Sequence, residues 1–375
     1  GIYMETQLTR SQLGRHGRFS MGLLGLLGLL LLPRFARGAV KVGYDPEQGT
    51  YVRTSDGKWE FNPYAMVQLL NTTSVPDGAP ASTSVAVHAA KLIFHGHIFA
   101  PALTYHFQVN FGDGKAAAEN MYLYYQPLRR LGLLIGQIEV PLNRQHITLE
   151  AYQQFVERSQ VDAQFTLRRN VGLAVYVNTT KRTVEWTTGI WRAPAADLSA
   201  MTLAPMLTTR VALSPMGPIE FREGDLALSH KPRLQVALAG AYDPHPAESA
   251  APASGSTSEP GETLQAVAEV TLRFRGISLT SEGHLRRRGG SASALSYGAF
   301  VQAGVLVLPP SVELAARYAR LGGDLASADI ERETTAGASY YFHGHRLKLQ
   351  GQYSHTRTRV GMTQHRILAQ LEFFV

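Results

Sequence analysis

The sequence lacks cysteine, and after its first 38 residues it also lacks any apolar stretch long enough for a membrane-spanning helix. A chain without cysteine is not a small disulfide-stabilised scaffold, so burial and backbone pairing must hold this fold together. A helix that crosses a bilayer needs about 18 or more consecutive apolar residues. Any membrane span after residue 38 must therefore be a strand, because only helices and closed barrels satisfy their backbone hydrogen bonds in lipid.

Common catalytic motifs are also missing. The chain contains no Gly-x-Ser-x-Gly, no phosphate-binding loop and no paired-histidine protease helix, so the usual hydrolase and nucleotide-binding signatures are absent. Charged residues make up only 17% of the chain, and its formal net charge is +7. Five arginines and one glutamate lie in the first 38 residues, and without that segment the charge falls to +3. This mildly basic balance predicts no nucleic-acid partner.

The first 38 residues have the pattern of a secretory signal peptide. A basic region precedes an apolar run of twelve residues from Met21 to Leu32, and Pro33 follows it. The small residues Ala36 and Gly38 have the spacing of a cleavage site. The apolar run reaches only about 18 Å as a helix, against a hydrocarbon core of roughly 30 Å, so a retained anchor fits less well. We predict a signal peptide over 1–38 and a mature chain over 39–375.

The stretch "LTYHFQVNF", from Leu103 to Phe111, alternates apolar and polar residues. Side chains of a strand point to opposite faces with period two, so this run describes a ribbon with one apolar and one polar side. In a soluble sandwich the apolar side meets a protein core, whereas in a membrane barrel it meets lipid and the polar side lines a wet lumen. The number and length of such strands decide between the two.

Similar runs of about ten residues recur through the mature chain, and we count roughly sixteen strands. The 337 residues after position 38 give about 21 residues per strand, which suits ten-residue spans joined by alternating short turns and longer loops. A soluble sandwich would space shorter strands at about 8 to 12 residues. The count therefore favours an all-β fold, a transmembrane antiparallel β-barrel of roughly 16 strands.

The two faces of the late strands support this choice. In "RLKLQGQY", Leu347 and Leu349 share one face, while Lys348 and Gln350 share the other. Glu313 and Arg317 lie opposite Val312, Leu314 and Ala316, and the final run places Arg366, Gln370 and Glu372 opposite Ile367, Leu371 and Phe373. Only a water-filled interior tolerates charge on the polar face throughout a protein.

Three segments interrupt the strands. Residues 243–263 are rich in Pro, Ser, Ala and Gly and are predicted to form a long surface loop, and "GGDLASADIERE" from Gly322 is a second loop candidate. Residues 141–168 contain "LEAYQQFVER", in which Leu149, Tyr152, Phe155 and Val156 have helical spacing. A long insertion with a helical turn inside a strand series is usually functional. We predict that 141–168 folds inward and constricts the barrel, within a single domain.

Three stretches carry a resemblance to a known family: "GYDPEQGTYVRTSDGKWEFNPYAMVQL", "GLLIGQIEVPLNRQHITLEAYQQFVERS" and "ERETTAGASYYFHGHRLKLQGQYSH". They resemble the phosphate-selective porins of Gram-negative outer membranes, over nearly the whole mature chain. Members of that family are 16-stranded trimeric barrels that pass anions, some with phosphate or polyphosphate preference, through basic side chains at the constriction. The resemblance implies a passive diffusion channel. Glu139 stands where the family usually has a basic residue.

An anion path needs fixed positive charges in a narrow throat of low dielectric constant. Arginine suits it, because its planar fork pairs with phosphate oxygens and does not lose its proton. The inserted loop, its junction with the wall and the presumed inward faces supply the candidates, which are Arg144, Arg158, Arg168, Arg169, Arg273, Arg317, Arg346 and Lys348. The alternative is that these groups balance Glu150, Glu157 and Asp162 in a network that ties the loop to the wall.

Two further basic motifs have structural interpretations. "HGH" occurs at 95–97 and at 343–345, and two histidines at i and i+2 of a strand share a face. Because no third ligand is defined by the sequence, we interpret both as strand junctions where glycine permits tight geometry, and we expect no metal and no cofactor. Arg286, Arg287 and Arg288 are expected at a rim, where such clusters are solvated or bind lipopolysaccharide phosphates.

We therefore predict a porin of a Gram-negative outer membrane, not an enzyme. It would be a homotrimer in contact with membrane lipid and lipopolysaccharide, and would admit small hydrophilic solutes with a preference for anions such as phosphate. The alternatives are an outer-membrane β-barrel enzyme and an exported soluble β-sandwich that binds glycans.

Overall fold

A computed structural model describes residues 39–45, 49–192, 205–244, 261–289, 294–324 and 330–375. The predicted signal peptide, most of the predicted loop at 243–263 and the centre of the loop after Gly322 lie outside the described residues. Among the described residues, no helix has the length and apolar character that a membrane crossing requires.

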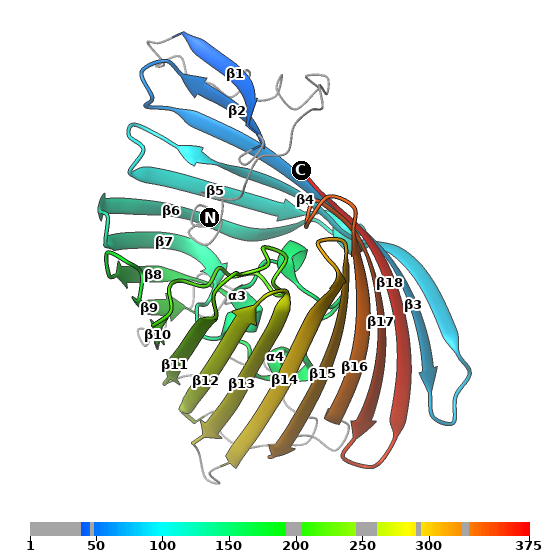
Figure 1. Cartoon of the computed structure of the whole chain (residues 1–375). Helices are drawn as coiled ribbons and strands as arrows, with labels where there is room; N and C mark the ends of the chain where they lie inside the picture. The colour runs from blue at the N-terminus through cyan, green and yellow to red at the C-terminus, as the bar shows by residue number, and fades with distance from the viewer. Residues whose placement is uncertain (1–38, 46–48, 193–204, 245–260, 290–293, 325–329) are drawn as a thin grey trace.

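Sixteen antiparallel strands form a closed barrel (Figure 1). They are β3 (Glu60–Pro76), β4 (Ser82–His97), β5 (Leu103–Asn110), β6 (Ala117–Leu128), β7 (Leu131–Glu139), β8 (Arg169–Asn178), β9 (Val184–Arg192), β10 (Met206–Leu213), β11 (Arg233–Asp243), β12 (Thr263–Phe274), β13 (Ile277–Arg288), β14 (Ala294–Leu308), β15 (Val312–Gly323), β16 (Ile330–Tyr341), β17 (Leu347–Thr358) and β18 (Thr363–Phe374). The barrel closes where β18 pairs with β3, from Phe374 opposite Met66 to Gln364 opposite Pro76. The predicted fold class and strand number are confirmed.

The barrel has two distinct ends. We call the end at which β18 finishes the carboxyl end, and the end that holds the β7–β8 connection the loop end. Residues 140–168, which we call the constriction loop, enter from the loop end between β7 and β8. Residues 214–232, which we call the inner segment, enter from the carboxyl end between β10 and β11.

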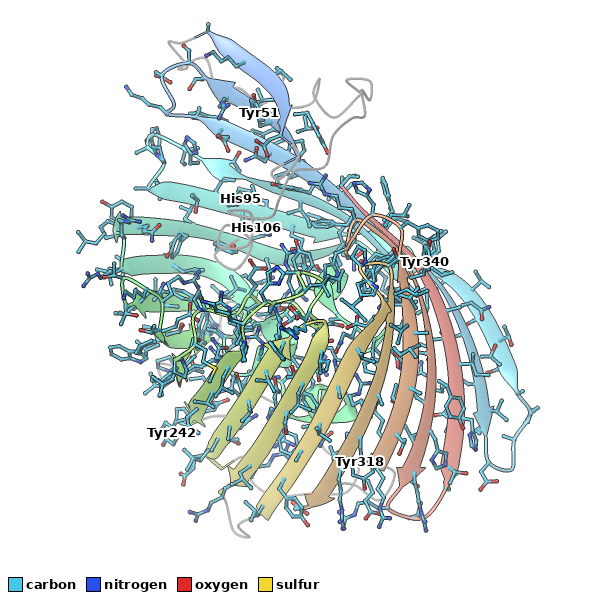
Figure 2. The ribbon with its side chains drawn as sticks, in the orientation of Figure 1. Tyr51, His95, His106, Tyr242, Tyr318 and Tyr340 are labelled. Atoms are coloured by element: carbon cyan, nitrogen blue, oxygen red, sulfur yellow. The ribbon has the colours of Figure 1, made fainter. Side chains whose placement is uncertain are left out.

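Alternation along the strands separates a polar interior from an apolar exterior. Lys348, Gln350 and Gln352 on β17 are buried inside, whereas Leu349 and Tyr353 are exposed outside, as predicted. Outward aromatic side chains gather toward each end: Tyr242 and Tyr318 lie toward the loop end, and Tyr340 lies toward the carboxyl end (Figure 2). Two aromatic girdles around an apolar band are typical of barrels that span a membrane.

An N-terminal hairpin extends the sheet beyond the barrel, and the sequence pattern did not predict it. Strands β1 (Val40–Asp45) and β2 (Gly49–Thr54) pair with each other, and the end of β2 also pairs with the start of β3. Val52 of β2 packs with Phe61 and Tyr105 in one apolar cluster. Tyr105 is consequently only 7% exposed, whereas Phe107 is 45% exposed. The alternation of β5 places both rings on its apolar face, but only Phe107 is exposed there, because the hairpin covers Tyr105.

The constriction loop contains short helices rather than one amphipathic turn. They are α3 (Arg144–Ile147), the 3₁₀ turn η2 (Glu150–Tyr152) and α4 (Gln160–Phe165). Outside this loop, a further 3₁₀ turn, η1 (Gly112–Gly114), lies between β5 and β6. The predicted helical turn over Leu149–Val156 is thus wrong beyond Tyr152. The carbonyl of Gln153 accepts hydrogen bonds from Lys348 and Gln350 of the wall, and the backbone there is extended. Hydrogen bonds from wall side chains therefore satisfy a backbone carbonyl that a longer helix would pair within itself.

Candidate channel lumen

Two chain segments meet inside the barrel, and Figure 1 shows α3 and α4 surrounded by the ring of strands. The backbone N–H of Glu223, in the inner segment, donates to the carbonyl of Tyr152, in the constriction loop, at 2.8 Å. The carboxylate of Glu223 accepts from the backbone N–H of Gln154 at 2.9 Å. The guanidinium of Arg222 lies 4.6 Å from the centre of the Tyr152 ring. Segments from opposite ends of the barrel therefore form one joined structure across the lumen.

Carboxylates of the wall hold the backbone of the constriction loop. Glu269 on β12 accepts from the N–H of Arg144 at 3.0 Å, and Glu282 on β13 accepts from the N–H of Gln145 at 2.6 Å. Both carboxylates and both loop residues are buried. Hydrogen bonds to a charged acceptor are roughly twice as strong as neutral ones. The two wall glutamates therefore fix the start of α3 against the wall.

A chain of ion pairs connects the wall to the loop near β4, β6 and β8. Arg169 lies 2.8 Å from Glu139 and 3.5 Å from Glu119. Lys91 lies 2.8 Å from Glu119 and 2.7 Å from Glu150 of the loop. The acidic residue at 139 is thus neutralised by Arg169, one of the predicted pore-lining residues. Each charge in this chain has an opposite charge beside it, which lowers the cost of burying it.

The loop carboxylates are held in their charged form. Burial alone would raise the pKa of the Glu150 carboxyl, but the charges of Lys91 and Arg158 hold that pKa at about 2. Burial would likewise raise the pKa of Asp162, but His146, Arg158 and a hydrogen bond from Asn143 hold it at about 2. Both carboxylates therefore stay ionised at neutral pH and keep their partners.

Two of the predicted arginines stabilise the loop from within. Arg158 donates to three loop carbonyls, those of Gln145, His146 and Thr148, at 3.0 to 3.2 Å. Arg144 donates to Gln235 of the wall at 2.7 Å and to a carbonyl of the inner segment, and its guanidinium lies 4.6 Å from the centre of the Phe221 ring. These contacts match the alternative interpretation, in which arginines tie the loop to its surroundings.

Three predicted residues reach inward from the wall. Arg317 pairs with Glu333 at 2.6 Å and donates to the carbonyl of Glu157 at 3.0 Å. Lys348 donates to the carbonyl of Gln153 at 3.1 Å, and Arg273 donates to a carbonyl of the inner segment at 3.0 Å. All three wall residues are buried. Their inward orientation agrees with the sequence pattern, and each of them contacts one of the two lumen segments.

Arg168 and Arg346 lie apart from these groups. Arg168 is exposed at the end of the constriction loop, where its backbone has a φ of 56° and its carbonyl accepts from Val140 at 3.0 Å. Arg346 lies in the β16–β17 turn and donates to the hydroxyl of Tyr44 in the hairpin at 2.8 Å. The structure thus gathers six of the eight predicted residues around the lumen segments, and their role as a solute path stays a prediction.

The other basic motifs of the sequence fall at the barrel ends. In the second "HGH", Gly344 has a φ of 56° in the turn between β16 and β17, which confirms the junction there. Arg286 donates to the carbonyl of Gln164 at 2.8 Å, so the first arginine of that cluster supports the constriction loop instead of extending from the rim. Within the described residues, no group of three or more His, Asp or Glu side chains could hold a metal ion.

Sequence reasoning missed two features of the lumen. The first is the group of wall glutamates that anchor the constriction loop, of which Glu269 also pairs with Arg210 at 2.5 Å. A single acid within an otherwise apolar alternating strand, as in "AVAEVTL", is the signal that marks such a position. The second is an apolar part of the inner wall on β6 to β10, where Tyr124, Tyr176 and Trp191 pack together. Strands β6 to β10 therefore present an aromatic cluster to the interior in addition to charged side chains such as Glu119 and Arg169.

No protein-family model matches the sequence, and no curated protein matches it. The fold is similar to that of an anion-selective porin from Comamonas acidovorans, with a TM-score of 0.60 and 10% identity over 84% of this chain and 99% of that chain. It is similar to the outer membrane channel DcaP of Acinetobacter baumannii, with a TM-score of 0.56 and 11% identity over 86% and 99%. It is also similar to the trimer form of OmpT, an outer membrane protein of Vibrio cholerae, with a TM-score of 0.54 and 8% identity over 84% and 99%. At these identities the likeness concerns the fold, and this chain has the 16-stranded barrel fold of outer-membrane porins.

Proposed function

We propose that this protein is an outer-membrane channel through which small hydrophilic solutes diffuse down their concentration gradients, with a preference for anions such as phosphate. The observation that carries the proposal is a closed barrel with an apolar exterior and a polar interior, into which a loop is folded and held by buried glutamates. Fixed charges and narrowing segments inside a barrel are the features that set permeation in porins.

The apolar outer surface of the barrel supports a location in the outer membrane of a Gram-negative bacterium. Tyrosines toward both ends and aliphatic side chains between them match the interfaces and hydrocarbon core of a bilayer. Phe107, Leu314 and Leu349 are among the outward side chains that would contact lipid. We also propose a homotrimer, in line with the barrel whose fold this chain shares and which is described as a trimer form. The leader predicted over 1–38 would direct export.

Anion preference rests on charges that carboxylates do not offset. Buried arginines that pair with a carboxylate, as Arg317 does with Glu333, contribute little net field to a passing ion. Arg168 is exposed where the constriction loop rejoins the wall, and a guanidinium there attracts anions entering from the loop end. One barrel with a similar fold is described as an anion-selective porin. Phosphate is the solute that the sequence resemblance points to, and it is the first to test.

Electrical measurement in a planar bilayer tests the proposal. The full chain, extracted in detergent, should give ohmic conductance, and its reversal potential under a potassium chloride gradient should have the sign of anion preference. Added phosphate should reduce the chloride current if the two anions compete for one path. A cation-preferring reversal potential would contradict the anion preference and leave the channel standing. Absence of conductance, together with an activity abolished by one serine or histidine substitution, would instead identify a barrel enzyme.

A further inference from the structure

Three arginines face each other directly on neighbouring strands near the loop end. Arg320 on β15 pairs with Arg332 on β16, and Arg332 pairs in turn with Arg357 on β17. Side chains opposite each other in an antiparallel pair have Cβ atoms about 4.5–5.5 Å apart. The three guanidinium groups therefore start from one continuous row across three strands, which we call the arginine row.

The arginine row points away from the lumen. The next position along each strand, occupied by Ala319, Glu333 and Thr356, is buried inside the barrel. Adjacent residues of a strand lie on opposite faces, so Arg320 and Arg357 project outward, and both are exposed. Arg332 belongs to the same row, and 49% of its side chain is exposed.

The row is not neutralised by the protein, in contrast to the arginines inside the barrel. Like charges placed directly opposite on a sheet are destabilising. Arg332 has one carboxylate nearby, that of Glu331, at 3.6 Å. In the described ranges of the chain, neither Arg320 nor Arg357 has a carboxylate within 4.0 Å. Inside the barrel, by comparison, Arg317 lies 2.6 Å from Glu333. The row thus leaves an excess of positive charge that an anion would stabilise.

The neighbouring rows place this charge at a membrane interface. The next outward row toward the carboxyl end contains Tyr318, which belongs to the aromatic girdle at the loop end (Figure 2). The row after it contains Ala316, Ala336 and Tyr353, and the next one contains Leu314, Ala338 and Gly351. Aromatic girdles lie at the level where hydrocarbon meets headgroups. The arginine row consequently lies at the headgroup level, next to the girdle, beyond which lies a surface of small, aliphatic and aromatic side chains.

We propose that Arg320, Arg332 and Arg357 form a binding site for the phosphate groups of an anionic membrane lipid. Guanidinium groups pair with phosphate oxygens through two parallel hydrogen bonds. Strands lie about 4.8 Å apart, so the row spans about 10 Å between its outer strands. One phosphate contacts two neighbouring arginines, and a headgroup with two phosphates engages all three. The lipid, rather than free phosphate, is the ligand because the apolar rows beside the site can hold its acyl chains. This inference rests on the membrane placement in the proposed function, and not on ion selectivity.

Binding of purified lipopolysaccharide to the full chain in detergent tests the site. The variant with Arg320→Gln, Arg332→Gln and Arg357→Gln should bind at least about tenfold more weakly than the unaltered protein. The matched control carries Arg129→Gln, Arg130→Gln and Lys181→Gln, which remove the same charge from exposed turns at the carboxyl end. The control should bind normally. Both variants should migrate as folded barrels on unheated gels, because none of the altered side chains is buried.

Two further measurements distinguish a bound lipid from free phosphate and from a general effect of surface charge. Lipopolysaccharide whose phosphates have been removed should bind the unaltered protein as weakly as the intact lipid binds the row variant, and millimolar inorganic phosphate should displace little of the bound lipid. Equal losses in the row variant and the control, or unchanged binding of the phosphate-free lipid, would overturn the site. Displacement by inorganic phosphate would overturn the assignment to a lipid. Conductance of the row variant should equal that of the unaltered protein, so a failure of this site is distinguishable from a failure of the channel.

Discussion

The carboxylate of Glu333 accepts a hydrogen bond from the backbone N–H of Gln160 at 2.7 Å. This contact joins β16 of the wall to the first residue of α4, so the constriction loop is anchored at a point 173 positions away in the sequence. The same carboxylate pairs with Arg317, and the two groups are buried together. One side chain therefore serves both as a counter-ion and as an anchor of the loop.

Replacement of Glu333 by alanine should destabilise the barrel by about 3 to 5 kcal/mol, because it leaves the buried charge of Arg317 without its partner. The change should also increase fluctuations of the open-channel current, since α4 loses an anchor. Urea titration and single-channel recording measure the two effects. Glu331→Ala removes a more exposed carboxylate two residues away and is the control. Equal stability of the two variants would show that Glu333 is not an anchor.

The loop should keep its attachment over a wide range of pH. The carboxyls of Glu150 and Asp162 have pKa values of about 2, below their ordinary values of 4.5 and 3.8. A lowered pKa in the folded state stabilises the fold fully above the ordinary value, and this contribution is lost as pH falls through the folded value. Conductance should therefore be steady down to a pH of about 5 and become noisy between about 4 and 2. A Glu150→Gln variant should show part of that noise at neutral pH, and a loop released already at a pH of about 6 would contradict the assignment.

Charge reversal at Arg168 should weaken anion preference without unfolding the protein. Arg168 is exposed, so its replacement costs little stability, and a glutamate there repels entering anions. The ratio of anion to cation permeability should fall about twofold in roughly 0.1 M salt and less in about 1 M salt, because salt screens an exposed charge. Reversal potentials measure this ratio. Arg53→Glu, on the hairpin, is the control, and an equal fall in both variants would show that Arg168 has no special position.

The N-terminal hairpin should detach when Tyr105 is replaced by alanine. The ring packs with Val52 and Phe61, and its hydroxyl donates to the carbonyl of Glu60 at 3.1 Å. Loss of a buried aromatic side chain costs about 3 to 5 kcal/mol, and here the loss concerns the contact between hairpin and barrel. Limited trypsin digestion should then cleave at basic residues of the hairpin while the barrel stays intact. Phe107→Ala, two positions away on the same strand face, should leave the hairpin resistant.

The sixteen barrel strands could be predicted because water on one side and an apolar medium on the other impose the same alternation on every strand, as in Lys348 to Tyr353. The hairpin could not be predicted in this way. Its strands are only six residues long, and Val52 is buried by contact with β3 and β5 and not by a barrel wall. The alternation of β5 likewise does not distinguish Tyr105, which the hairpin covers, from Phe107, which is exposed.

The position of the constriction loop could be predicted from its length and its interruption of the strand pattern. Its path could not, because the groups that hold it are distant in the sequence: Glu269 lies 125 positions from Arg144, and Glu282 lies 137 positions from Gln145. Residue type alone identified arginines as candidates for an anion path. The partner of each arginine depends on which backbone carbonyl of the folded loop lies beside it, and this cannot be predicted from the local sequence.

The anchors of the constriction loop also constrain the order in which the barrel assembles. Glu269, Glu282 and Glu333 belong to β12, β13 and β16, all of which follow the loop in the chain. During synthesis the loop therefore emerges after Lys91, which pairs with its Glu150, but before these three glutamate anchors, so it is not fully seated until the last third of the chain has formed strands. Complete seating of the loop is thus a late event in assembly, as is closure of the barrel by pairing of β18, the last strand, with β3.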